Sequence, residues 1–352
     1  MKKHYKSPNE KSFFDEENRR KALSEVMHPL KRLELCINFE VFRKDLEKAF
    51  NHTPRGPGGR PAYDLVMMFK VLVLQRTYDL SDARTQFAIN DSLSMQDFLG
   101  LTLADDAPDE KTIWAFRESL SVFGIEKTLF EHFNRGLLES GLIMKKGSII
   151  DASFVEVPIQ RNSREENQVI KEGHVPKDWT KPKNAQKLAQ KDLDARWTKK
   201  NDVNYYGYKD HVKVDIGSKL ITEYSVTDAS VHDSQEIQNL LGENDVNKPC
   251  YADSAYVGEP IEEMLVELGI ENKINEKGYR GKPLTKSQIR KNRTKSKIRA
   301  RVEHVFGFIE NSLGGSTLRT IGMRRAKFGI GLMNLIYNLF RSEQIIRLRL
   351  VT

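Results

Sequence analysis

The sequence predicts an α/β fold in which an all-helical N-terminal domain precedes a mixed-sheet domain. Up to about residue 143 the apolar residues recur at helical spacing, whereas from Gly147 onward short apolar runs have the length and residue types of strands. These strands alternate with helical segments, which is typical of a mixed sheet covered by helices. At 352 residues the chain is long enough to fold as two or three domains.

The first part of the chain is predicted to be a polar arm followed by short helices. Residues 1–54 are expected to form a mobile arm and the first helices, and a Gly/Pro-rich loop follows at residues 53–61. Residues 55–143 are expected to form a helical domain. Its helices are expected at residues 65–73, 81–90, 93–99, 108–120 and 123–142, with Arg84, Lys111 and Arg117 exposed. Such a domain fits either a helix-turn-helix DNA reader or a helical packing unit without DNA contacts, and both interpretations stay open.

Strands and helices alternate in residues 144–347, the predicted mixed-sheet domain. A strand at 148–157 precedes a polar, lysine-rich insertion at 158–203, which is expected to be a loop or a partly ordered excursion rather than a core element. Two strands around a turn at 216–219 form a predicted hairpin. The remaining elements are expected as strands at 248–253 and 270–274, helices at 233–242 and 261–268, one long helix with an apolar face from Ile298 to Leu313, and a last helix with an apolar stripe from Phe328 to Ile346.

Positive charge is concentrated in one segment. The net charge is +8, yet residues 281–301 contain nine basic residues and no acidic one, so the rest of the chain carries a net charge of −1. The nine are Lys282, Lys286, Arg290, Lys291, Arg293, Lys295, Lys297, Arg299 and Arg301. Such a cluster is expected where a protein neutralises a phosphate backbone, although a solvated basic loop has the same composition.

Other features of the sequence exclude several classes of protein. No run of about 18 apolar residues is present, so no membrane-spanning helix is expected. The polar N-terminus does not resemble a secretory signal. The two cysteines, Cys36 and Cys250, lack partners at metal-ligand spacing. A cytoplasmic location is therefore expected.

Three carboxylates stand out by their positions. Asp151 directly follows an apolar pair on a predicted strand, and Asp253 ends another short apolar strand. A charge at such a position is costly unless it is paired or binds a metal. Glu303 lies on the predicted long helix, one turn beyond Arg299. Each has a simpler interpretation: Asp151 could bond to backbone amides, Asp253 could form an Asx turn, and Glu303 could pair with Arg299.

The combination of the three is rarer than any one of them alone: two strand-end aspartates are followed by a basic segment and then by a glutamate on a helix. Cleaving or joining a phosphodiester requires an activated oxygen nucleophile and a stabilised leaving oxygen, and two Mg²⁺ ions about 3.5–4 Å apart serve both needs. Mg²⁺ prefers oxygen ligands and retains water, so a few carboxylates suffice to hold it. Two-metal nucleases of the RNase H-like fold use this arrangement, and we therefore expect an RNase H-like catalytic domain at 144–347.

At these residues the chain resembles the DDE transposases of bacterial insertion sequences, of the IS-five kind within the wider IS-four grouping. The resemblance covers roughly residues 55–345. It rests on blocks at residues 59–63, 78–82, 109–113, 150–153, 206–211, 227–233, 252–256 and 298–304. Each block alone is loose, but all of them in this order are highly specific.

The resemblance implies that Asp151, Asp253 and Glu303 bind two Mg²⁺ ions, for which Mn²⁺ can substitute. It implies a helical domain that helps to recognise terminal inverted repeats, cleavage of the 3′ ends by water, and attack of the freed 3′-OH on target DNA. The implied partner is double-stranded DNA, bound by a homodimer in the bacterial cytoplasm, in association with the nucleoid. The expected DNA contacts are Lys209, His211, Lys291, Arg293, Lys295, Lys297, Arg299 and Arg301.

The sequence departs from the wider family's pattern around the glutamate. That pattern has a tyrosine seven residues before the glutamate, an arginine four before it and a lysine seven after it. The arginine is present as Arg299, but the other two positions hold Ser296 and Glu310. Glu310 reverses a charge, so one phosphate contact of the family is missing, and either Lys297 or Arg301 could substitute.

Three other functions are compatible with parts of the sequence. The chain could be a domesticated or inactive transposase that only binds DNA, although its intact triad argues against this. It could also be a metal-dependent nuclease without strand transfer, which the fold alone does not exclude. A phosphohydrolase with a metal dyad at His232 and Asp233 would need further distant histidines, which the sequence lacks. His211 and His304 are interpreted as hydrogen-bonding neighbours of the site rather than as metal ligands.

Overall fold

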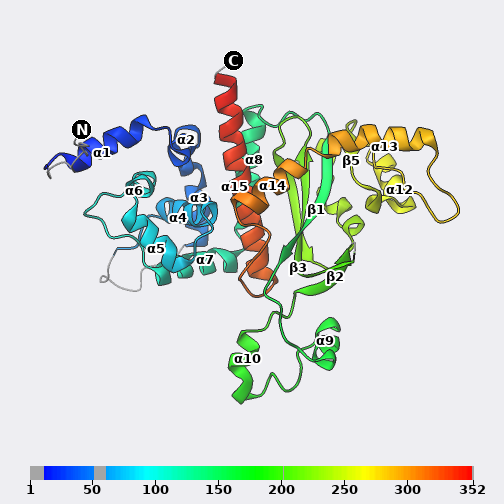
Figure 1. Ribbon diagram of the computed structural model, residues 1–352, viewed down its shortest axis with the longest axis horizontal. Helices are drawn as coiled ribbons and strands as arrows, with labels where there is room; N and C mark the ends of the chain where they lie inside the picture. The colour runs from blue at the N-terminus through cyan, green and yellow to red at the C-terminus, as the bar shows by residue number, and fades with distance from the viewer. Residues whose placement is uncertain (1–11, 51–60, 201, 351–352) are drawn as a thin grey trace, which may run out of the picture.

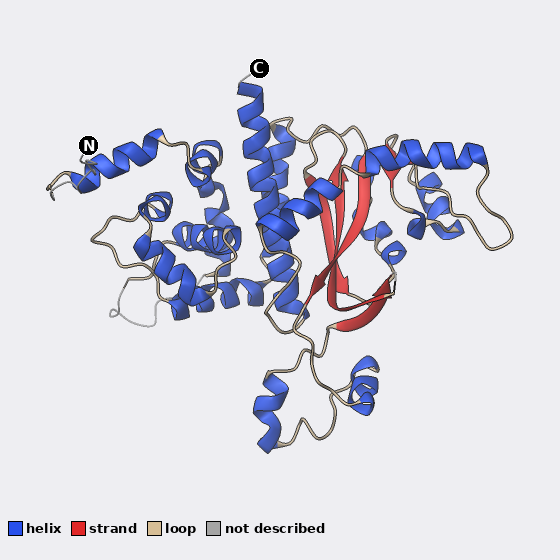
Figure 2. Cartoon of the chain, in the orientation of Figure 1, coloured by secondary structure: helices blue, strands red, loops and turns tan. Residues whose placement is uncertain are grey.

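The computed structural model describes residues 12–50, 61–200 and 202–350. Within them the C-terminal helix α15 (Met323–Leu350) stands between a group of N-terminal helices on one side and the sheet on the other (Figure 1). The strands form one continuous layer, with helices beside it (Figure 2). The Gly/Pro-rich loop, with its two arginines, falls outside the described residues except for Pro61.

The predicted helical N-terminal region is confirmed. Ser81 accepts a hydrogen bond from the backbone N–H of Arg84, and Asp109 accepts one from that of Thr112, so each caps the first turn of a helix. The described part of the predicted arm is itself helical. The helices are α1 (Asp15–Glu25), α2 (Pro29–Cys36), η1 (Phe39–Phe42), α3 (Arg43–Ala49), α4 (Leu65–Thr77), α5 (Asp82–Asp91), α6 (Leu93–Leu99), α7 (Glu110–Phe123) and α8 (Glu126–Glu139).

The mixed sheet has the topology of an RNase H-like fold. β4, β3 and β1 are antiparallel neighbours, and β5 and β6 follow parallel to β1, which gives the order β4–β3–β1–β5–β6. β2 pairs with the first residues of β3, on the edge that β4 occupies further along. The predicted hairpin is confirmed as β3 and β4. The strands are β1 (Ser148–Glu156), β2 (Arg196–Lys200), β3 (Val203–Asp215), β4 (Ile221–Asp228), β5 (Pro249–Tyr251) and β6 (Glu271–Asn272).

Apolar side chains of the sheet belong to two separate clusters. Ile149 and Val212 belong to the main core, which continues through α15 into the N-terminal helices, so the core is not interrupted near residue 143. Ile150 belongs to a smaller cluster under α11 (Ile237–Leu240) and α12 (Glu259–Glu267). Because neighbouring side chains of a strand point to opposite faces, Asp151 shares the face of Ile149. None of the described helices, α15 included, has the length and apolar composition needed to cross a membrane.

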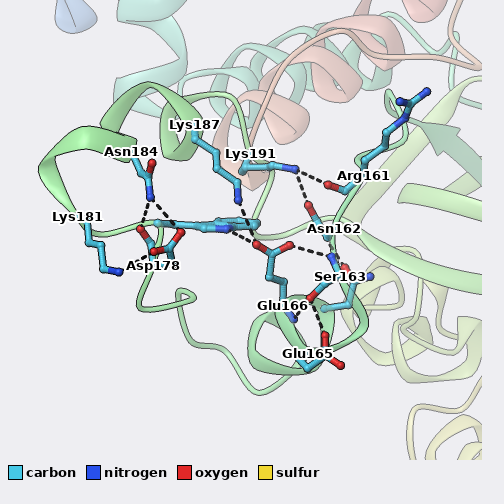
Figure 3. Close-up of polar contacts among 12 residues, drawn as sticks. Arg161, Asn162, Ser163, Glu165, Glu166, Asp178, Lys181, Asn184, Lys187 and Lys191 are labelled. Atoms are coloured by element: carbon cyan, nitrogen blue, oxygen red, sulfur yellow. Dashed lines mark hydrogen bonds and ion pairs between the residues drawn. The ribbon is translucent and has the colours of Figure 1, made fainter.

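The insertion at 158–203 is folded, so the expectation of a loop or partly ordered excursion is wrong. α9 (Arg164–Lys171) and α10 (Ala185–Ala189) project beyond one end of the sheet (Figure 1), and β2 joins the sheet. Trp179 is fully buried, and its indole N–H donates to Glu166 Oε1 at 2.6 Å. The ammonium groups of Lys187 and Lys191 lie 5.0 and 5.2 Å from its ring centroid (Figure 3). One tryptophan enclosed by charged side chains therefore forms a small core of the insertion.

The predicted long helix is also wrong, because the structure divides it into α13 (Lys286–Arg299) and α14 (Glu303–Ser312). At residues 300–302 the chain makes a tighter turn, in which the amides of Arg301 and Val302 bond to carbonyls three residues back instead of four. Val302 is fully buried at this break. The break places the basic segment and Glu303 on different helices, whereas the predicted last helix is confirmed as α15.

Candidate active site

The sheet places Asp151 on β1 and Asp253 two residues beyond the end of the neighbouring parallel strand β5. In the register of β1 and β5, Ser148 is opposite Cys250 and Ile149 is opposite Tyr251. Continued by two residues, the same register sets Asp151 beside Asp253, which directly follows Ala252 at the end of β5. Two carboxylates that lie about 100 residues apart in the sequence are therefore neighbours at one edge of the parallel strands.

Asp151 is an almost fully buried carboxylate held by one guanidinium. Its side chain is 12% exposed, and Arg299 Nη1 donates to its Oδ2 at 2.6 Å. The backbone N–H of Ala152 donates to Oδ1 at 2.9 Å. Burial raises the pKa of Asp151 to about 6, while Arg299 and the Ala152 amide oppose this rise. The charges of Asp253 and Glu303 add to it, so both lie within electrostatic range of Asp151.

Asp253 begins the short 3₁₀ turn η5 (Ser254–Tyr256). Its Oδ1 accepts the backbone N–H of Ala255 at 2.7 Å, so the Asx-turn interpretation of this residue is confirmed. The turn uses one of the two carboxylate oxygens. Among the described residues no cation pairs with Asp253, and its charge is balanced only by this backbone dipole.

Glu303 is the first residue of α14 and is exposed at the helix N-terminus, where the helix dipole favours negative charge. The alternative that it merely pairs with Arg299 is wrong, because the break at 300–302 directs Arg299 to Asp151 instead. In the described part of the chain Glu303 has no ion-pair partner. The predicted triad thus consists of two adjacent aspartates and a glutamate in their electrostatic field.

The carboxylate oxygens of Asp151, Asp253 and Glu303 are suitable ligands for a divalent cation, although the three groups do not converge on one position. Three carboxylates and one guanidinium leave two negative charges without a partner, and Mg²⁺ and Mn²⁺ prefer such oxygen donors. Across the described residues, no group of three or more His, Cys, Asp or Glu side chains could hold a metal ion as it stands. Arg299 is bonded to Asp151 Oδ2, so a shared cation requires side-chain movement.

Helix α13 presents a stripe of free cations. Lys286, Arg290, Arg293 and Lys297 recur every three or four residues and therefore share one face. These four, together with Lys291, make no ion pair with any described residue. We call the four residues the α13 stripe. Of the stripe, only Arg293 and Lys297 were expected to contact DNA. Their helical spacing also places Lys286 and Arg290 on the same face, and this signal could have identified them as further DNA contacts.

The opposite face of α13 is bonded to the protein. Asn292 exchanges hydrogen bonds of 2.9 and 2.8 Å with the backbone of Glu276, and Lys295 Nζ donates to Ile274 O at 2.7 Å. Ser296 Oγ accepts from Asn275 Nδ2 at 3.1 Å. Arg299 continues this inward face and reaches Asp151. Lys295 and Arg299 are therefore structural contacts here, while the α13 stripe faces solvent.

Two other expected DNA contacts, Lys209 and His211, lie in the interior, and for them the prediction is wrong. Lys209 Nζ donates to Asp233 Oδ1 at 2.7 Å and to Val231 O at 2.6 Å. His211 is fully buried, and burial lowers its pKa to about 4. β3 is a central strand whose two faces are both covered, so neither side chain reaches the surface. The ion pair with Lys209 also occupies Asp233, so His232 and Asp233 do not form the metal dyad that a phosphohydrolase would need.

The remaining predicted positions have partners within the protein. Glu310 Oε1 accepts from Ser153 Oγ at 2.9 Å, so this departure from the family pattern faces β1 two residues beyond Asp151. Arg301 Nη1 donates to Ile216 O at 2.7 Å. Arg117, expected to be exposed, forms an ion pair of 2.5 Å with Asp82. Of the proposed substitutes for the missing lysine, Lys297 is therefore the one that stays free among the described residues.

The sequence matches a family model described as transposase DDE domain over residues 144–339, which is more than half of the chain. A second model, described as a transposase domain (DUF772), matches residues 17–119 in the helical region. Among solved structures, the cryo-EM structure of the piggyBac transposase synaptic complex with hairpin DNA is similar at a TM-score of 0.45 and 12% identity, covering 89% of this chain and 75% of that chain. The first match contains Asp151, Asp253 and Glu303, and the chain belongs to the transposase DDE domain family.

Proposed function

We propose that this transposase binds the terminal inverted repeats of an insertion sequence of the IS-five kind, cleaves their 3′ ends and joins them to target DNA. Asp151, Asp253 and Glu303 would hold two Mg²⁺ ions, with Mn²⁺ able to substitute. The observation that carries the proposal is the placement of a buried Asp151 on β1 and of Asp253 just beyond the neighbouring parallel strand β5, with both Asp253 and Glu303 in electrostatic range of Asp151. Buried carboxylates with raised pKa values are typical of reactive sites.

The chain's own residues position the DNA and maintain the charge of the site. The α13 stripe would contact phosphates along about 16 Å, because Lys286 and Lys297 are separated by eleven helical steps of about 1.5 Å each. α13 ends at Arg299, so a DNA backbone that follows the stripe is led toward Asp151. Arg299 favours the ionised form of Asp151, which is the form that binds a cation. When bound, the divalent cations supply activation of the oxygen nucleophile and stabilisation of the leaving oxygen.

Joining two ends of one element calls for two active sites, so a homodimer on double-stranded DNA is the proposed assembly, acting at the bacterial nucleoid. The helical region matched by the second transposase model is the proposed reader of the inverted repeats. Its exposed cations Arg84 and Lys111 lie on α5 and α7. Arg117 is left out because it pairs with Asp82.

The catalytic part of the proposal is tested with Asp253→Asn and a linear DNA carrying one terminal repeat, mixed with supercoiled plasmid. Wild type should nick the 3′ end and give joined plasmid, whereas D253N should bind DNA without cleaving it. Mg²⁺-dependent cleavage by D253N would remove Asp253 from the site. Cleavage by wild type without joined product would instead identify a nuclease, and binding alone would identify an inactive DNA-binding protein.

The DNA-binding part is tested by converting Arg290, Arg293 and Lys297 of the α13 stripe to glutamine. The logarithm of the affinity falls with the logarithm of the salt concentration, and the slope should become shallower by about 0.9 for each lost phosphate contact. A matched control removes three exposed lysines of the insertion. These are Lys171, Lys177 and Lys183. An unchanged slope in the stripe variant, or an equal change in the control, would show that the stripe does not face DNA.

A further inference from the structure

Tyr256 carries a buried hydroxyl beside the candidate metal ligands. It lies three residues after Asp253, and its backbone N–H donates to Asp253 O at 3.3 Å, so one short turn holds both residues. The side chain is 1% exposed. Its hydroxyl is buried and has no hydrogen-bond partner among the described residues. A buried hydroxyl without a partner is unfavourable, and most such groups in proteins are paired.

Carboxylates on three different segments lie within electrostatic range of this hydroxyl. Burial, followed by the charges of Asp151, Asp233 and Asp253, raises the pKa of Tyr256 well above its usual value, so the group stays a neutral O–H donor. Asp233 is paired with Lys209 at 2.7 Å, and Asp151 with Arg299 at 2.6 Å. Asp253 is the one of the three that has no cationic partner in the described structure. The free donor therefore belongs to the same short turn as Asp253, the aspartate whose charge is not balanced, and lies within its electrostatic range.

We propose that Tyr256 is a positioning residue of the metal site, whose hydroxyl donates a hydrogen bond to an oxygen that contacts the cation bound by Asp253. That oxygen belongs either to the Asp253 carboxylate or to a cation-bound water, and in both cases the bond orients the ligands. The inference rests on the proposed function, in which Asp151 and Asp253 are metal ligands. Loss of such an outer hydrogen bond typically weakens metal affinity about 10- to 100-fold.

A purely structural role makes a different prediction. The ring of Tyr256 packs in the smaller core with Ile150, Cys250 and Leu265, and a phenylalanine would keep this packing. If the ring alone matters, Y256F will leave the cation dependence unchanged. If the hydroxyl serves the metal site, Y256F will weaken cation binding although it removes an unfavourable group from the metal-free protein.

Tyr224 on β4 provides a matched control within the same chain. Its hydroxyl is also buried without a partner in the described part of the chain. The acidic groups that act on it are Glu126, Asp210, Glu223 and Glu131, none of which belongs to the candidate site. Y224F therefore removes the same kind of group at a place where no cation is proposed.

The experiment follows thermal unfolding of the full-length chain in EDTA and during titration with MnCl₂ or MgCl₂. In EDTA both Y256F and Y224F should unfold about 2 °C above wild type, because each loses an unpaired buried hydroxyl. In the titration Y256F should need at least about tenfold more cation for half of the stabilisation, while Y224F follows wild type. A Y256F titration that superimposes on wild type, or an equal shift in Y224F, overturns the inference.

D253N separates this inference from the proposed function. If D253N keeps the wild-type cation response, the metal site itself is misassigned, whatever Y256F does. If D253N loses the response and Y256F weakens it, Tyr256 serves the site even when wild type fails to join DNA ends. If D253N loses the response and Y256F does not change it, the site stands and the role of Tyr256 is refuted.

Discussion

Replacing Asp151 by asparagine should stabilise the metal-free protein at neutral pH while it removes DNA cleavage. Burial raises the pKa of Asp151 from 3.8 to about 6, which means that folding disfavours its ionised form. Well below pH 4 the carboxyl is protonated in both the folded and the unfolded chain, so it carries no penalty. Between about pH 4 and pH 6 the unfolded chain ionises this carboxyl while the folded chain largely keeps it protonated, so stability falls over this window and levels off above it.

The size of this effect follows from the shift. About two pKa units correspond to about 3 kcal/mol of unfolding free energy, at 1.36 kcal/mol for each unit. D151N cannot ionise, so at pH 8 in EDTA it should be more stable than wild type by up to this amount, or by about 5 °C in Tm. The difference should shrink toward zero at pH 4. Addition of Mg²⁺ should stabilise wild type by about 2.7 kcal/mol at 100 times the Kd, and the variant much less.

The assay is thermal unfolding of both proteins between pH 4 and pH 8, with and without Mg²⁺, alongside DNA cleavage. Asn338→Asp is a control of opposite sign, because it places a new carboxyl at a fully buried position in α15 and should destabilise more strongly as the pH rises. A D151N protein that is no more stable than wild type at pH 8, or whose gain persists at pH 4, would refute the reasoning.

Three further outcomes follow from the structure. Arg299→Gln should move the acidic limb of the cleavage–pH profile to higher pH, because Arg299 lowers the pKa of Asp151; an unmoved limb in R299Q would contradict this. Gly207→Ala should cost about 3 kcal/mol or more in urea unfolding, because Gly207 has φ +152° and a Cβ there would lie 2.3 Å from Val155 O. Gly136→Ala in helix α8 meets no atom and should instead stabilise by about 0.5–1 kcal/mol, because alanine has the higher helix propensity. Trp179→Ala should cost about 3–5 kcal/mol locally; protease cleavage within 160–195 and an intact sheet are expected, and resistance there would contradict the assigned core.

The positions of Asp151 and Asp253 on and just after strands could be predicted because a local sequence pattern indicates them. A short apolar strand that ends in a carboxylate is visible in the sequence for both Asp151 and Asp253. Their adjacency depends on β5 lying next to β1 rather than on the far side of the sheet, which the sequence does not specify. The resemblance to a known family, and not the pattern of residues, supplied that pairing.

The break between α13 and α14 could not be predicted from local sequence. Residues 300–302 are Ala, Arg and Val, with neither proline nor glycine to end a helix, and intrinsic propensity favours continuation. The break is a tertiary effect, in which Val302 enters the core and Arg299 bonds to Asp151. The folded state of the insertion could not be predicted for a related reason. Its core is one tryptophan covered by lysine side chains, and such a core produces no periodic pattern of apolar residues.

The buried position of Lys209 and His211 was accessible in principle. Both lie on β3, which runs between β1 and β4, and a central strand of a sheet covered on both faces buries its alternate residues as well. The basic and imidazole groups suggested DNA, but a lysine at such a position needs a buried carboxylate. Asp233 supplies it, and the two family blocks that contain Lys209 and Asp233 are joined by this ion pair.

The balance of charge distinguishes the candidate site from the structural ion pairs of the sheet. Lys209–Asp233 and Lys213–Asp245 are buried ion pairs within the sheet, as expected of structural charges. At the candidate site the balance differs, because three carboxylates share one guanidinium and a buried hydroxyl lacks a partner.

A second buried polar group, around Tyr224, Glu126 and Asp210, also lacks some hydrogen-bond partners. There burial raises the pKa values of Glu126 and Asp210, to about 7 for Asp210, which favours their neutral forms. Asp151 is instead bonded by Arg299, the last residue of the basic helix α13, whose stripe faces solvent and could contact a phosphate. Excess negative charge beside a cationic surface is what a metal-dependent phosphodiester site requires, and only the first group combines the two within the described residues.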